Sequence, residues 1–146
     1  MSASPRFQGC QLTLKQGRHW SDAAILRPDV LGQWSADQLR DYLGEFFEIA
    51  DAPDDTLILR GLPALDGFGS HMTAGRLIIH GQVGDELGAS MLGGIIQVHG
   101  RAGNRVGGPA LQNNPKRQGM TGGSIVIHGD AGDYAGLRMR RGLIAI

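Results

Sequence analysis

The stretch that decides the fold runs from Met72 to Ile146, where one pattern of residues recurs. The first copy reads Met72-Thr-Ala-Gly-Arg-Leu-Ile-Ile-His80-Gly-Gln-Val-Gly-Asp85-Glu-Leu-Gly88. Further copies begin at Met91, Met120 and Met139, in steps of 19, 29 and 19 residues, so the long step holds one period and a ten-residue insertion. A weaker copy starts at Thr56. A repeated unit that cannot bury its apolar face alone is expected to stack on its neighbours.

Each copy contains a short run in which apolar residues alternate, and alternate residues of a strand share one face. The pairs that should form stacked columns are Leu57/Leu59, Leu77/Ile79, Ile96/Val98, Ile125/Ile127 and Ile144/Ile146. No segment between copies has the period of a crossover helix. The pattern therefore predicts an all-β fold, a parallel β-helix (solenoid) of coils of about 19 residues. Its corners would use the 24 glycines, for example Gly81-x-x-Gly84, at positive φ.

Length and charge narrow the functional classes. A chain of 146 residues fits one domain, and 14 basic against 14 acidic residues give no net charge, which does not favour nucleic-acid binding. No apolar run is long enough to span a membrane, and the first residues lack the apolar core of a signal peptide. Cys10 is the single cysteine, so no internal disulfide can form. These features predict a cytoplasmic protein.

The first 55 residues differ from the repeat. Residues 7–15 read as a strand, Ser35 and Gln38 form a capping box before a short helix that Gly44 ends, and an extended run resumes at Phe46. We expect residues 1–55 to be a mixed N-terminal capping segment with one short helix. Residues 56–146 would be the coils, within a single structural domain.

Two apolar or aromatic columns recur in the copies. The methionines at 72, 91, 120 and 139 should fill the core, although a soft metal or haem could bind such a ladder. His80, His99 and His128 should stack on the outward face as a solvated or partner-facing ladder. A zinc site there is the weaker interpretation, because no Asp, Glu or Cys recurs beside them.

Asp66, Asp85, Asn104 and Asp133 occupy one position of the repeat. Asx-turns that cap the corner backbone explain this column better than calcium sites do, since one member is neutral. The sequence contains no nucleophile motif, phosphate loop or convincing acid pair. It therefore predicts no catalytic residue and no metal ligand, and it leaves any cofactor-binding residues open.

The repeated Gly-x-(apolar)3-x-Gly-x-x-Gly-Asp/Asn-x-x-Gly resembles the GXGXG domain. That family includes the C-subunit of formylmethanofuran dehydrogenase and the C-terminal domain of the glutamate synthase large subunit. The run from Gly132 to Ile146, the insertion before Met120 and the leader around residues 31–49 look like the C-subunit branch. The resemblance covers residues 7–146. Family members usually continue for several more coils, so a truncated or naturally short form is expected.

The resemblance implies a right-handed β-helix that acts as a non-catalytic scaffold for catalytic subunits. In bacteria this C-subunit belongs to the formyltransferase/hydrolase complex of tetrahydromethanopterin-linked one-carbon metabolism. The resemblance implies no cofactor on this chain, whereas the complex uses methanofuran or an analogue and metals in other subunits. Three alternatives stay open: a glutamate-synthase-like structural module, a β-helix acyltransferase built from six-residue steps, and a carbohydrate-cleaving β-helix.

Three groups of residues are interface candidates. Apolar side chains on the outward strand face should be covered by protein, namely Ile78, Ile95 and Val126. Basic residues should form a ridge that is either a solvated surface, which is the favoured interpretation, or a docking site for an acidic protein surface or a polyglutamyl cofactor tail, namely Lys116, Arg117, Arg138, Arg140 and Arg141. The last strand, with Ile144 and Ile146, should contact another chain through residues 137–146. A two-fold homo-oligomer is the expected form.

Overall fold

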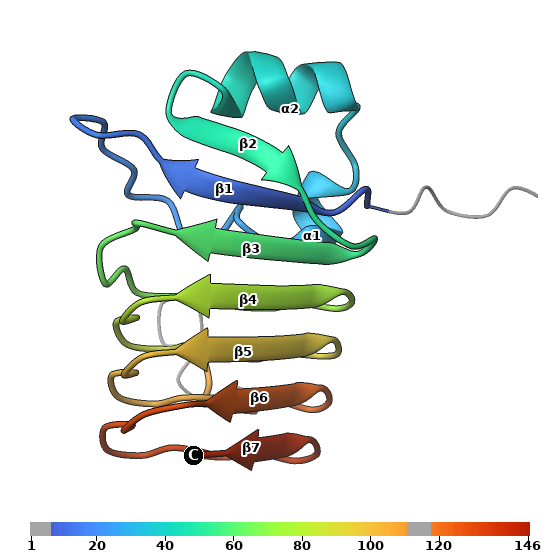
Figure 1. The fold of residues 1–146 in the computed structure, drawn as a ribbon. Helices are drawn as coiled ribbons and strands as arrows, with labels where there is room; N and C mark the ends of the chain where they lie inside the picture. Colours follow the sequence, from blue (N-terminus) through green and yellow to red (C-terminus); the bar gives the residue numbers. More distant parts are fainter. Residues whose placement is uncertain (1–6, 111–117) are drawn as a thin grey trace, which may run out of the picture.

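The computed structural model describes residues 7–110 and 118–146. In this part of the chain, seven strands form one sheet in the order β2-β1-β3-β4-β5-β6-β7, and two helices lie at one end of it (Figure 1). The elements, in chain order, are β1 (Cys10–Leu14), α1 (Pro28–Leu31), α2 (Ala36–Leu43), β2 (Phe47–Asp51), β3 (Thr56–Arg60), β4 (Arg76–His80), β5 (Ile95–His99), β6 (Ser124–Ile127) and β7 (Leu143–Ala145).

The strands pair in the register that the repeat predicts. Leu77 of β4 pairs with Ile96 of β5, Ile96 with Ile125 of β6, and Ile125 with Ile144 of β7. All of these pairs are parallel, as are β1–β3 and β3–β4, whereas β1 and β2 are antiparallel. Equivalent positions of successive copies therefore lie side by side in the sheet.

The predicted fold class is wrong. Instead of an all-β right-handed parallel β-helix, the described residues form a single open, mixed sheet with two helices (Figure 1). Each copy contributes one strand only, because its return segment is a series of turns. Non-glycine residues in these turns have positive φ, for example 62° at Glu86 and 52° at Ser90. Backbone of that conformation is not extended, so the return segments form no second strand although backbone hydrogen bonds join successive copies there.

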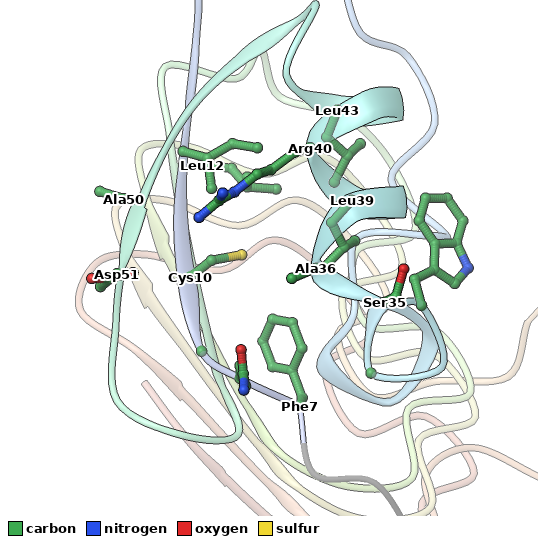
Figure 2. Close-up of a pocket in the computed structure, with 15 residues that line it drawn as sticks. Phe7, Cys10, Leu12, Ser35, Ala36, Leu39, Arg40, Leu43, Ala50 and Asp51 are labelled. Carbon is green, nitrogen blue, oxygen red and sulfur yellow. The ribbon is translucent and has the colours of Figure 1, made fainter.

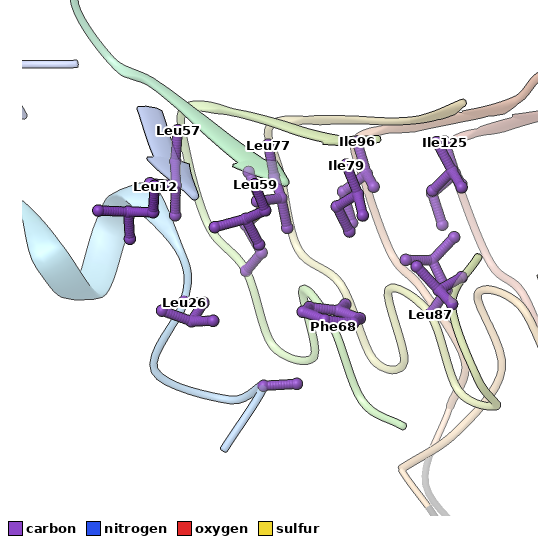
Figure 3. Close-up of a cluster of buried hydrophobic side chains, with 14 of the residues drawn as sticks. Leu12, Leu26, Leu57, Leu59, Phe68, Leu77, Ile79, Leu87, Ile96 and Ile125 are labelled. Carbon is purple, nitrogen blue, oxygen red and sulfur yellow. The ribbon is translucent and has the colours of Figure 1, made fainter. Parts of the chain in front are cut away.

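The core lies on the inner face of this sheet. Leu57, Leu77, Ile96 and Ile125 are fully buried in one column (Figure 3). The return segments cover them with further buried side chains, which include Phe68, Leu87, Val106, Met72, Met91 and Met120. The interpretation of the methionine column as core filling is confirmed for these three methionines, and Met139 packs partly buried against the same cluster.

The N-terminal helix prediction is confirmed. Ser35 Oγ accepts a hydrogen bond from Gln38 N at 3.1 Å, and Gln38 Oε1 accepts one from Ser35 N at 2.8 Å, so the capping box is complete. The N-terminal segment, expected to hold one short helix, also contains α1. Asp29 of α1 accepts from Thr73 N and Thr73 Oγ1, so α1 is held by a contact with a segment 44 residues away.

The Asx column is used differently from the prediction. Asp66 Oδ1 accepts from Asp85 N at 2.6 Å, Asp85 Oδ1 from Asn104 N at 2.7 Å, and Asn104 Oδ1 from Asp133 N at 2.8 Å. These bonds join successive copies, whereas Asx-turns would be local. We call this chain of bonds the Asx ladder.

The glycines that precede Asp85, Asn104 and Asp133 have a steric role. A Cβ on Gly103 would lie 2.3 Å from Asp85 Oδ1, and a Cβ on Gly84 would lie 2.1 Å from Asp66 Oδ1. Neither glycine is among the described residues with positive φ. The expectation that Gly84 and Gly103 turn corners through positive φ is therefore wrong, because they make room for the Asx ladder.

Helices in the described part of the chain are all too short and polar to cross a membrane.

Candidate functional site on the outer face of the sheet

The outer face of the sheet, opposite the core, is the surface on which the candidate site lies. Strand alternation that buries Leu77 and Ile79 turns Arg76, Ile78 and His80 outward. Equivalent outward positions on the other strands carry Ile58, Arg60, Ile95, Gln97, His99, Ser124 and Val126. Of the sequence-predicted apolar interface residues, Ile78, Ile95 and Val126 are all half-buried on this face. The structure brings them together with the histidine column.

The three histidines stack as predicted. The rings of His80 and His99 have centroids 4.7 Å apart and planes 9° apart, and those of His99 and His128 have centroids 4.7 Å apart and planes 4° apart. The spacing is that of neighbouring strands, so the sheet itself sets it. Arg60 pairs with His80 across β3 and β4 and continues the column, and its Nε donates to Gln11 Oε1 at 3.1 Å.

The environment of this column disfavours protonation of His80. Partial burial, the Arg60 charge and the neighbouring His99 together lower the pKa of His80 below its ordinary value. The column therefore presents a largely neutral imidazole next to a cation near pH 7. Among residues 7–110 and 118–146, no group of three or more His, Cys, Asp or Glu side chains is placed to hold a metal ion.

A second feature is a pocket of about 300 Å³ between α2 and strands β1 and β2 (Figure 2). Cys10 and Leu12 line it from β1, and Leu39 and Arg40 from α2. Burial raises the pKa of the Cys10 thiol to about 11, so it stays protonated and is a poor nucleophile at neutral pH. The pocket is a gap between α2 and the sheet, and the charged side chain of Arg40 reaches across it (Figure 2).

Sequence reasoning missed this pocket. The available signals were the alternation of Cys10 with Leu12, which turns the thiol inward, and the helical stripe that includes Leu39. Neither signal gives the distance between α2 and the sheet.

The remaining predicted interface residues that the structure describes lie at the β7 end. Arg138, Arg140 and Arg141 are exposed there, so they are accessible to a partner. Lys116 and Arg117 lie outside the described residues, and the basic ridge stays a prediction. Ile144 is half-buried and Ile146 is 65% exposed. Self-association through residues 137–146 likewise stays a prediction.

Comparison with solved structures gives an informative similarity, whereas no protein-family model and no curated protein sequence matches the chain. The chain is similar to a chain in the crystal structure of the formyltransferase/hydrolase complex (FhcABCD) from Methylorubrum extorquens in complex with methylofuran. The TM-score is 0.68, the sequence identity is 28%, and the similarity covers 92% of this chain and 61% of that chain. This chain thus spans about three-fifths of the length of its structural neighbour.

Proposed function

We propose that this protein is a non-catalytic subunit of a formyltransferase/hydrolase-type complex, equivalent to its C-subunit, and that it acts as a scaffold for the catalytic subunits. The observation that carries the proposal is the structural similarity to a chain of the FhcABCD complex over 92% of the present chain. The repeated GXGXG-like motif supports the same family. The neighbour's methylofuran supports methanofuran or an analogue as the cofactor of the complex, held by other subunits.

The outer face of the sheet supports a scaffold role. Ile78, Ile95 and Val126 are half-buried on it and alternate with the polar side chains of Arg76, Gln97 and Ser124, and the stacked histidines lie at the next outward position. Protein interfaces typically combine apolar and polar side chains in this way. Because the core is built on the opposite face, folding leaves this face available for a partner.

Affinity purification of the tagged full chain from its native cells, with identification of the co-purifying subunits, tests the proposal. We expect formyltransferase-like and hydrolase-like subunits. Ile78→Glu should remove them, because a carboxylate without a partner would be buried in the interface and weaken assembly by more than about tenfold. Leu92→Glu is the matched control, since Leu92 is 55% exposed and lies outside the strands.

The results separate two questions. If the wild-type chain is purified without such subunits, the assignment to this kind of complex is wrong. If Ile78→Glu keeps the subunits as well as Leu92→Glu does, the complex stands but the outer face of the sheet is not the interface. Circular dichroism and thermal unfolding of both variants show whether loss of subunits reflects loss of fold.

A further inference from the structure

Beside the pocket described above, which Trp34 also lines, the surface of α2 carries two aromatic rings in an edge-to-face arrangement. Trp34, in the turn before α2, and Tyr42 have ring centroids 5.5 Å apart and planes 78° apart. Together with Gln38 and Asp41 these rings line a hollow in the surface. We call it the aromatic corner. Tyr42 is 51% exposed, and the face of an aromatic ring carries negative electrostatic potential.

The aromatic corner is fixed before any ligand arrives. Tyr42 is 51% exposed, yet Trp20 packs edge-on against it from another direction, with centroids 6.0 Å apart and planes 80° apart. Trp20 is itself buried against Phe46 and Phe47, so Tyr42 is supported by the core of this end of the protein. Both tryptophans of the chain thus contact one exposed tyrosine. A rigid aromatic site loses little conformational entropy when it binds.

Charge at the aromatic corner favours a cation. Asp41 lines the hollow, and Asp37 lies one turn earlier on the same helix. Asp37 lies in the first turn of α2, where a carboxylate stabilises the helix dipole, whereas Asp41 lies in the second half of the helix, where it gains no such stabilisation. Beside the aromatic rings, Asp41 provides a counter-charge. An aromatic pair with an adjacent carboxylate is the arrangement that binds guanidinium and ammonium groups.

We propose that the aromatic corner binds an arginine side chain presented by a partner protein. A planar guanidinium can lie on one ring while its N–H edge donates to the Asp41 carboxylate, which a lysine ammonium cannot do with the same geometry. Four described residues line the hollow, and all of them lie within α2 or the turn before it. They are too few to enclose a free small molecule. An interface side chain gains its remaining burial from the surrounding contact surface.

Binding of short blocked peptides to the full 146-residue chain, followed by NMR of the two tryptophan indole N–H signals, tests the proposal. The probes are alanine-flanked peptides that carry a central arginine, lysine or citrulline, and guanidinium chloride. Citrulline has the shape of arginine without its charge. The arginine peptide should shift the Trp34 signal. The Trp20 signal should shift less, because Trp20 is buried behind Tyr42 and its Nε1 donates to Asp22 O at 2.7 Å.

Substitutions then test the residues of the aromatic corner. Tyr42→Leu and Asp41→Asn should each weaken binding of the arginine peptide by about twofold to fivefold, and Tyr42→Phe should retain it. Tyr134→Leu is the matched control, since Tyr134 is 68% exposed at the other end of the protein. Should Tyr42→Leu fail to fold, the exposed Asp41→Asn still gives the answer.

Four outcomes would overturn the proposal. If the citrulline peptide bound as tightly as the arginine peptide, the site would not recognise a cation. If the lysine peptide bound as tightly as the arginine peptide, the site would have no preference for guanidinium. If guanidinium chloride bound as tightly as the arginine peptide, the proposal that the ligand belongs to a partner protein would be wrong. A shift of the Trp20 signal alone would place the ligand elsewhere. None of these results depends on whether the subunits of the proposed complex co-purify, because the aromatic corner is separate from the outer face of the sheet.

Discussion

Substitution of Gly103 by alanine is the sharpest test of how successive copies are joined. The new Cβ would lie 2.3 Å from Asp85 Oδ1 and 2.9 Å from the backbone of Gly84. Asp85 Oδ1 is the atom that accepts the hydrogen bond from Asn104 N at 2.7 Å. Because Gly103 is not among the residues with positive φ, alanine can adopt its backbone conformation. The expected damage therefore comes from contact with the Asx ladder.

The expected cost follows from three contributions. Loss of a hydrogen bond to a carboxylate costs about 1.5–3 kcal/mol, and the lower end applies because the Asp85 side chain is 38% exposed. The contact with the Gly84 backbone adds about 1–3 kcal/mol. Alanine also lowers the conformational entropy of the unfolded chain, which offsets the loss of stability by about 0.4–1 kcal/mol. The free energy of unfolding should fall by about 2–4 kcal/mol, which lowers the urea midpoint by about 1–2 M.

Urea unfolding monitored by circular dichroism measures this change. Gly108→Ala is the matched control, because a Cβ at Gly108 would meet no atom closer than 3.2 Å and Gly108 also lacks positive φ. Asp85→Asn should be milder than Asp85→Ala, since the amide oxygen of Asn104 already fills the same role toward Asp133 N. In the Asp85→Ala background, Gly103→Ala should cost less than it does alone.

Additive effects of Gly103→Ala and Asp85→Ala would refute the reasoning, because they would show that the alanine does not act through the Asx ladder. So would a Gly103→Ala variant as stable as Gly108→Ala.

Three further outcomes can be measured by the same unfolding experiments. Ser35→Ala should lower the free energy of unfolding by about 1 kcal/mol through loss of the α2 cap, whereas the exposed Ser21→Ala should change it little. Leu77→Ala should cost about 2–5 kcal/mol, because it leaves a cavity in the fully buried column. The lowered pKa of His80 means that the unfolded state binds a proton more readily than the folded state. Stability should therefore be constant above a pH of about 6.5 and decrease as the pH falls below it, and His80→Gln should reduce this decrease.

The sequence was informative where short-range patterns determine structure. Period-two alternation placed Leu77, Ile96 and Ile125 in one buried column, and the Ser35–Gln38 spacing marked the start of α2. In both cases the signal and its physical cause lie within a few residues of one another.

Prediction failed where contacts between distant segments decide the conformation. Glu86 and Ser90 have positive φ although neither residue type favours it, and they donate backbone hydrogen bonds to Asn104 O and Gly108 O of the next return segment. Those bonds hold the return segments as turns and prevent further strands, which is why the fold class was wrong. The four-residue α1 is likewise held by the contact of Asp29 with Thr73.

Comparison of the copies within this chain separates the demands of folding from those of other roles. At the inner position that holds Leu77, strands β3, β5, β6 and β7 also carry leucine or isoleucine, because the core requires it. At the outer position that holds Ile78, the neighbouring strands carry isoleucine, glutamine and valine, so folding tolerates polar and apolar groups there. Yet the next outer position carries histidine in three successive copies. Partial burial beside Arg60 makes protonation of His80 unfavourable, so the histidine stack carries a cost at low pH that a glutamine column would not. Folding alone does not explain this uniform column, and it lies on the face of the sheet that we propose as the partner interface.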